Sequence, residues 1–65
     1  MFEGEYLNGK RNGKGKEYNY YYDIQYLKFE GEYLNGQRNG KGKEYNYDGK
    51  LRFEGEYLKG EKKEK

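Results

Sequence analysis

Residues 29–60 read FEGEYLNGQRNGKGKEYNYDGKLRFEGEYLKG, and this stretch decides the fold. Its first six residues, FEGEYL, alternate an aromatic residue or glycine with glutamate or leucine, which is the period of two that a strand requires. Asn-Gly pairs at 35–36 and 39–40 and an Asp-Gly pair at 48–49 favour positive φ and tight reversals of the chain. The stretch has no helical period, and each glycine costs about 1 kcal/mol in a helix interior. The pattern therefore predicts an all-β fold of short antiparallel strands.

The same residues recur elsewhere in the chain. Residues 2–20 repeat residues 29–47 with a single difference, Lys10 in place of Gln37. A third copy begins at Phe53 and ends after one predicted strand. Self-similarity of this kind indicates a repeat architecture, in which each unit covers the apolar face of its neighbour. We predict one module at 1–60 with two and a half tandem copies (repeats 2–28 and 29–52 and a half repeat 53–60), followed by a frayed charged tail at 61–65.

Opposite charges predict how the strands pair. A two-residue turn at 48–49 places Gly40 opposite Tyr57, and a four-residue loop at 35–38 places Gly40 opposite Tyr33. In both registers each lysine lies between glutamates of its two neighbouring strands, and such pairs contribute about 0.2–1 kcal/mol each. We therefore predict a single-layer twisted antiparallel meander of about five strands, with an aromatic and glycine face and a charged face. The charged face carries Glu3, Glu5, Glu30, Glu32, Glu54 and Glu56 against Lys14, Lys16, Lys41 and Lys43.

One pair of residues in each copy disturbs this alternation. A glutamate after Gly-x-Gly-Lys points to the aromatic face, and the tyrosine that follows it points to the charged face. Either a bulge near 16–17 re-phases the tyrosine, or the tyrosine stacks on a base of the next strand as a cation–π pair. The residues concerned are Glu17, Tyr18 and Lys28 in the first copy and Glu44, Tyr45 and Arg52 in the second.

The composition excludes several functional classes. The chain has no His, Cys, Ser or Thr, which removes ordinary zinc, haem and iron–sulfur sites, disulfides and the usual hydroxyl and thiol nucleophiles. We therefore expect no enzyme, no cofactor and no metal. Twelve acidic residues lie among fourteen basic ones, so we expect no nucleic-acid partner. No signal peptide or spanning apolar run is recognisable, and the lack of cysteine agrees with a cytoplasmic protein.

Residues 2–60 resemble the MORN repeat (membrane occupation and recognition nexus). That family's pattern is an aromatic residue, glycine two residues on, an aromatic residue two further, and then glycine, Gly-x-Gly and a closing glycine. The matching positions are Phe2, Gly4, Tyr6, Gly9, Gly13 and Gly15 in the first copy, Phe29, Gly31, Tyr33, Gly36, Gly40, Gly42 and Gly49 in the second, and Phe53, Gly55, Tyr57 and Gly60 in the third. Where the family commonly has an aromatic residue two places after Gly-x-Gly, this chain has Glu17 and Glu44.

The resemblance implies a sheet of stacked hairpins that acts in scaffolding, self-association and protein binding, without catalysis by the repeat itself. We expect a homo-oligomer or a protein partner. The row of aromatic side chains on one face either contacts that partner or forms the core of the repeats, and we call it the aromatic row. Its members are Phe2, Tyr6, Phe29, Tyr33, Phe53 and Tyr57.

The alternative implied by the resemblance is weak binding to anionic phospholipid at a membrane surface. Lys14, Lys16, Lys41 and Lys43 are expected to be neutralised by the flanking glutamates. Of the bases in the loops and the strands beside them, this leaves Lys10, Arg11 and Arg38, which are expected at turn tips. Each free base contributes about 1 kcal/mol near an anionic surface, so two or three give weak association of a cytoplasmic protein with membranes.

Overall fold

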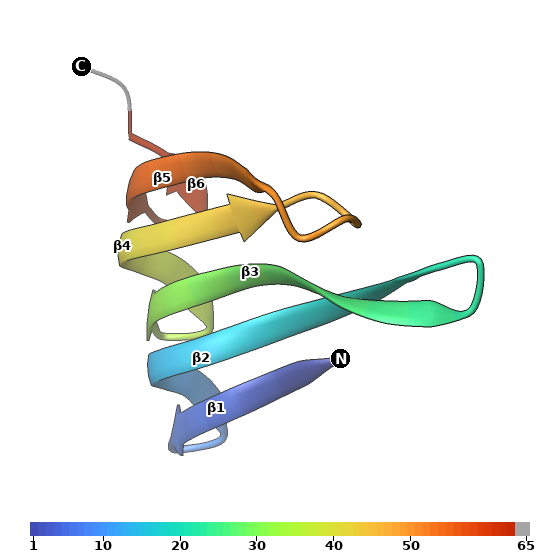
Figure 1. The fold of residues 1–65 in the computed structure, drawn as a ribbon. Coiled ribbons are helices and arrows are strands. Elements are labelled where there is room, and N and C mark those ends of the chain that lie inside the picture. Colours follow the sequence, from blue (N-terminus) through green and yellow to red (C-terminus); the bar gives the residue numbers. More distant parts are fainter. Residues whose placement is uncertain (64–65) are drawn as a thin grey trace.

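Six strands form one antiparallel sheet in the computed structural model (Figure 1), which describes residues 1–63. The strands are β1 (Phe2–Leu7), β2 (Lys10–Tyr21), β3 (Ile24–Leu34), β4 (Gln37–Tyr45), β5 (Leu51–Leu58) and β6 (Glu61–Lys62). They follow one another across the sheet in chain order. The molecule measures 33 × 31 × 13 Å, so the predicted single-layer, all-β antiparallel meander is confirmed. Among the described residues, no helix is long and apolar enough to cross a membrane.

The third copy continues one strand further than predicted. Lys59 and Gly60 have φ values of 53° and 88°, close to the 52° and 79° of Asn8 and Gly9 in the first hairpin. This turn reverses the chain, and β6 pairs with the end of β5. Six strands therefore replace the predicted five, and the first two residues of the predicted tail 61–65 are ordered as β6. Residues 64–65 of that tail lie outside the described part of the chain.

Between repeats, the strands pair in the predicted register. Gly40 of β4 lies opposite Tyr57 of β5, and Gly13 of β2 lies opposite Tyr33 of β3. In the same two ladders the lysines lie opposite glutamates, as at Lys43 and Glu54. A slip by one residue would separate all of these pairs, which is why charge was a sound guide to this register.

Within each repeat, the predicted register is wrong near the turn. Tyr33 lies opposite Arg38 rather than Gly40. Asn35 and Gly36, with φ values of 52° and 86°, form a two-residue turn, and the second Asn-Gly pair is absorbed as an irregularity of β4, where Gly40 has a φ of 101°. Both Asn-Gly pairs tolerate positive φ, and a two-residue turn needs only one of these two pairs. The hairpin of β1 and β2 shows the same shift.

The core is built within this single layer. Phe29 is fully buried, and Tyr33 and Tyr57 are 4% and 3% exposed. The Phe29 ring lies between the backbone of Gly42 and the guanidinium of Arg38, whose Cζ atom is 4.0 Å from the ring centroid. A Cβ atom at Gly42 would lie 2.6 Å from the ring, so a side chain there would occupy the place of the phenyl group. The glycine backbone on one side of the ring and the guanidinium on the other thus bury it, in place of the second layer of structure that usually packs on a sheet.

The additional residues of the first copy lengthen one hairpin. β2 and β3 have 12 and 11 residues, whereas β4 has 9. Tyr22 and Asp23, with φ values of 50° and 64°, lie between β2 and β3. Positive φ at both central residues is the geometry of a type I′ turn, whose twist matches that of the flanking strands. This hairpin extends well past the other strand ends (Figure 1).

Candidate functional site

A carboxylate on the aromatic face joins the first repeat to the second. Glu17 accepts two hydrogen bonds from the Arg38 guanidinium, from Nε to Oε2 and from Nη2 to Oε1, both at 3.0 Å. It also accepts a hydrogen bond from the Tyr33 hydroxyl, and Arg11 Nη1 lies 4.0 Å away. Paired charged hydrogen bonds are roughly twice as strong as neutral ones. The residue that departs from the family pattern therefore provides a polar link between repeats.

Glu44 makes the corresponding contacts between the second and third copies. It accepts a hydrogen bond from the Tyr57 hydroxyl. Arg38 Nη1 lies 3.5 Å and Lys62 Nζ 3.6 Å from its carboxylate. Lys62 Nζ also lies 4.5 Å from the centroid of the Phe53 ring. Lys62 thus covers Phe53 in the third copy as Arg38 covers Phe29 in the second. Arg38 thus lies between two carboxylates and contacts all three copies.

These contacts shift the pKa values of Glu17, Tyr33 and Tyr57. Burial raises the pKa of the Tyr33 and Tyr57 phenols, and their hydrogen bonds to Glu17 and Glu44 raise it further. Burial alone would raise the pKa of Glu17, but hydrogen bonds from Arg38 and Tyr33 outweigh it and hold that pKa below 4.5. At neutral pH the phenols therefore donate and the Glu17 carboxylate accepts. The arrangement stabilises the repeat stack.

The hydroxyls of Tyr18 and Tyr45 show which face these tyrosines occupy. Tyr18 donates to Glu3 at 3.2 Å and Tyr45 donates to Glu30 at 2.6 Å, so both lie on the charged face. The hydrogen bond to Glu30, together with burial, raises the pKa of Tyr45 to about 12.

A bulge is present beside each tyrosine, but on the neighbouring strand. Tyr18 pairs with Leu27, which makes Lys28 the extra residue, and Arg52 is the extra residue beside Tyr45. The bulge therefore does not re-phase the tyrosines, and within residues 1–63 neither stacks on Lys28 or Arg52. Neither sequence alternative is right, because hydroxyl contacts with the glutamates take their place.

The aromatic row forms the core of the repeats. Its rings meet edge to face, with centroids 5.0 Å apart for Phe2 and Tyr33 and 5.2 Å apart for Phe29 and Tyr57. Phe2 and Phe53 are half-buried and pack against this cluster. Tyr6 is the exception, with 58% of its surface exposed. The packing supports the core alternative for the row, and contact of its members with a partner stays a prediction.

The three bases predicted at turn tips lie in strands. Arg38, in β4, has only 20% of its side chain exposed and is ion-paired on the aromatic face. Arg11, in β2, is 39% exposed and lies 4.2 Å from the centroid of the Phe2 ring. Lys10 is exposed at the first residue of β2. Arg38 is therefore part of the core packing, and lipid contact by these bases stays a prediction.

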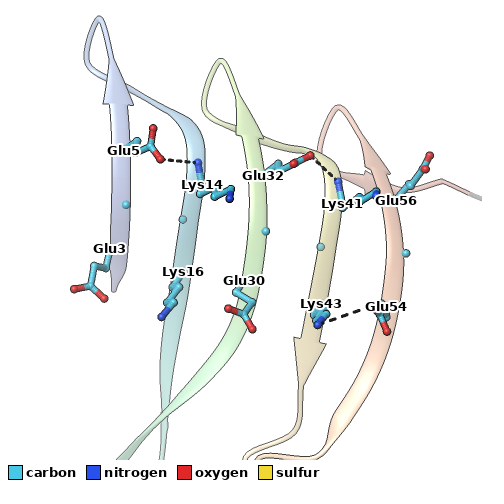
Figure 2. A pocket seen from close by; sticks show the side chains of 15 residues that line it. Glu3, Glu5, Lys14, Lys16, Glu30, Glu32, Lys41, Lys43, Glu54 and Glu56 are labelled. Atoms are coloured by element: carbon cyan, nitrogen blue, oxygen red, sulfur yellow. Dashed lines mark hydrogen bonds and ion pairs between the residues drawn. The ribbon is translucent and has the colours of Figure 1, made fainter.

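The charged face forms an open groove of about 950 Å³ across five strands. Figure 2 shows its acidic and basic side chains in alternation from strand to strand. Lys43 Nζ lies 3.9 Å from Glu54, and the Lys41 backbone N–H donates to Glu32 at 3.0 Å. Six glutamates and four lysines line the groove, so its charges are largely balanced within the sheet. This balance favours solubility of the face over strong attraction of any one charged ligand.

Four exposed apolar side chains meet where the turn between β2 and β3 lies beside the loop between β4 and β5. Tyr21 stacks on Tyr47 with ring centroids 4.0 Å apart, and it lies 4.5 Å from Tyr22. Ile24 pairs with Tyr21 beside the turn. All four are 42% to 83% exposed, and we call them the tyrosine tip. The sequence signal for three of these side chains is the run YYDI at 21–24, within the residues that distinguish the first copy from the second, whereas Tyr47 belongs to the repeated part.

Comparison with known protein families supports the repeat assignment. The model of the MORN repeat matches residues 2–19 and 29–50, which together make up more than half of the chain. The second match contains the buried rings Phe29 and Tyr33, and the first contains Phe2, which packs against that cluster. No curated protein and no solved structure matches the chain.

Proposed function

We propose that this chain, which belongs to the MORN repeat family, is a non-catalytic module that joins protein chains, in the first place two copies of itself, through the tyrosine tip. Repeats of this family often act in protein or membrane interactions. The observation that carries the proposal is a contiguous cluster of exposed apolar residues outside the core: Tyr21, Tyr22, Ile24 and Tyr47.

The chemistry of the tyrosine tip suits a protein interface. Contiguous exposed apolar groups on a soluble domain mark interaction sites more often than scattered ones do. Tyrosine is enriched among the residues that dominate binding energy, because its ring buries a large area while its hydroxyl finds a polar partner. The stacking of Tyr21 on Tyr47 already restricts both rings. Less conformational entropy is then lost when a partner covers them.

The other surfaces support this choice by what they already contact. Phe29, Tyr33 and Tyr57 of the aromatic row are covered within the chain. The charged groove pairs its own acids and bases. The side chains of the tyrosine tip, in contrast, are exposed, and contact with a partner would bury them.

Sedimentation equilibrium over a wide range of concentration tests the proposal. We expect the wild-type chain to dimerise, and the double variant Tyr21→Ser, Tyr47→Ser to associate at least about tenfold more weakly, a loss of about 1.4 kcal/mol. The variant should keep its far-UV circular dichroism, because the tip lies outside the buried cluster. A matched control is Leu7→Ser, which removes a 58% exposed side chain near the other end of β1 and β2.

Two results would contradict the proposal. One is a wild-type chain that stays monomeric at every concentration. The other is equal weakening by Leu7→Ser and by the double variant, which would show that no particular surface carries the association.

An anionic membrane surface is the second candidate partner for the same tip. Exposed Lys50 and Arg52 flank Leu51 close to Tyr47 in the chain, and Lys28 is exposed on β3. Tyrosines favour the headgroup level of a bilayer, and nearby bases add about 1 kcal/mol each at an anionic surface. Co-sedimentation with phosphatidylserine vesicles, compared with phosphatidylcholine vesicles, distinguishes this candidate. Binding to phosphatidylserine vesicles that is lost in Lys50→Glu, Arg52→Glu, by a chain that stays monomeric in solution, would assign the tip to membranes.

A further inference from the structure

We infer that the outer edge of β1 is a strand-addition site for an extended segment with the pattern Gly-Lys-Gly-Lys-Glu. This site lies on a different part of the molecule from the tyrosine tip and does not depend on the function proposed above. Within residues 1–63, β1 pairs with β2 alone. An unpaired edge presents a row of backbone donors and acceptors that another strand can satisfy.

The two interior copies define what this edge accepts. The strand FEGEYL occurs at the start of each copy, and in the second and third copies the preceding repeat covers its outer edge. In both cases the pairing is the same. The Gly, Lys, Gly, Lys and Glu of the covering strand lie, in that order, opposite the Tyr, Glu, Gly, Glu and Phe of FEGEYL. The covering segments are residues 13–17 of β2 and residues 40–44 of β4, and both read GKGKE. The same register on β1 sets the occupant's lysines against Glu5 and Glu3.

Tyr6 shows what the uncovered edge is missing. Tyr33 and Tyr57 are almost fully buried, and each donates its hydroxyl to the glutamate of the preceding GKGKE segment. Tyr6 occupies the same motif position and is 58% exposed. A glutamate at the end of the added segment would accept the hydrogen bond from the Tyr6 hydroxyl, as Glu17 does from Tyr33. The site therefore specifies the last residue of its ligand as well as the charge pattern.

In the second and third copies, the turn beside the FEGEYL strand donates a backbone hydrogen bond to the preceding repeat. The Gly36 N–H donates to the carbonyl oxygen of Arg11 in the preceding repeat at 2.9 Å, and the Gly60 N–H donates to that of Arg38 at 2.9 Å. Gly9 is the equivalent residue of the first hairpin. An added segment that begins with an arginine before its Asn-Gly would offer the matching carbonyl.

A second copy of β1 fits this edge poorly. Antiparallel pairing of two β1 strands about Gly4 would place Glu3 opposite Glu5, twice. Like charges directly opposite one another destabilise a strand pair. The interior GKGKE strands of a second copy already have neighbours on both sides. The occupant that the edge fits is therefore a free extended segment with alternating glycine and lysine and a closing glutamate.

A synthetic peptide tests the inference with the whole 65-residue chain. The probe is acetyl-RNGKGKEYN, the sequence of residues 11–19, with a fluorescent label joined through an amide bond to its carboxyl end. We expect saturable binding by fluorescence anisotropy, with amide chemical shifts changing in β1 and exchange protection appearing there. The matched control peptide RNGEGEEYN reverses both lysines and should bind at least about tenfold more weakly, because two attractive pairs become repulsive.

A chain variant tests the predicted contact of Tyr6. Tyr6→Phe keeps the ring and removes the hydroxyl. We expect this variant to bind the wild-type peptide about fivefold more weakly, which is the effect of losing one ordinary hydrogen bond. The same variant should not affect a peptide whose closing glutamate is replaced by alanine. Absence of saturable binding, equal binding of the charge-reversed peptide, or shift changes confined to residues 51–56 of β5 would each overturn the inference. The last result would place the site at the other edge of the sheet.

Discussion

Residues 2–7 and residues 29–34 are the same six amino acids, FEGEYL, yet they fold into different surroundings. Tyr33 is 4% exposed and Phe29 fully buried, whereas Tyr6 is 58% exposed and Phe2 half-buried. Inside each segment the Phe and Tyr rings meet in the same way, with centroids 5.5 Å apart in the first and 5.8 Å apart in the second. The difference is the strand that precedes the second segment. Burial in this molecule is therefore a property of the interface between repeats, as expected for a repeat stack.

The largest expected effect that separates the two segments is at the phenylalanine. Phe29→Ala removes a fully buried ring and should cost about 3–5 kcal/mol of unfolding free energy, enough to unfold most of a chain this small. Phe2→Ala should cost less than half as much, because Phe2 is already partly exposed. Urea unfolding followed by circular dichroism measures both. Equal losses would mean that the edge of the stack is as tightly packed as its centre.

The next largest effect is at Arg38 and Arg11, each of which lies nine residues after the phenylalanine of its segment. Arg38 makes two hydrogen bonds of 3.0 Å to Glu17 with its side chain 20% exposed, so Arg38→Gln should cost about 2 kcal/mol. Arg11 lies 4.0 Å from Glu17 and is 39% exposed, so Arg11→Gln should cost under about 1 kcal/mol. Thermal unfolding of the two variants ranks them. A larger loss for Arg11→Gln would contradict the central place given to Arg38.

A smaller effect concerns acid. Because hydrogen bonds from Arg38 hold the folded pKa of Glu17 below 4.5, the stability that Glu17 contributes is fully present above about pH 4.5. It is lost as the pH falls through the lower folded value. We expect urea midpoints to fall across this acid range in the wild type, and to fall less steeply in Glu17→Gln. An unchanged slope in this variant would exclude Glu17 as a source of the acid sensitivity.

The smallest effect concerns alkali, and it returns to the two tyrosines of the repeated segment. Burial and the hydrogen bond to Glu17 raise the folded pKa of Tyr33. Its contribution is therefore present below pH 10 and is lost as the pH rises through the folded value. Stability measured above pH 10 should fall less in Tyr33→Phe than in the wild type. Tyr57→Phe should show the same change, because burial and the hydrogen bond to Glu44 raise the folded pKa of Tyr57 as well.

The sequence predicts the pairing between repeats because that pairing depends on charge. Lysines opposite glutamates and Gly40 opposite Tyr57 follow from residue types alone. The pairing within a repeat depends on which of two Asn-Gly pairs makes the turn, and residue types do not distinguish the pairs. Tyr33 therefore faces Arg38 rather than Gly40.

The surroundings of single side chains were harder to predict than the strands. A base beside Asn-Gly pairs is typical of a turn tip, but Arg38 covers the Phe29 ring because the hairpin is shorter than predicted. The partner of Glu17 comes from the next repeat, 21 residues away, and is visible only when the strands are placed side by side. The tyrosine tip was missed for the same reason, since Tyr21 and Tyr47 meet only across two hairpins.

The order of the strands, β1 to β6 across the sheet, has a mechanical consequence. The first and last strands are at opposite ends of the stack (Figure 1), so tension between them acts across the strands. Hydrogen bonds of a sheet loaded in this direction open one after another, as in unzipping, whereas bonds loaded along the strands resist together. The module would therefore yield at low force and in steps, one hairpin at a time. It would lengthen under load while the remaining repeats kept their rings covered.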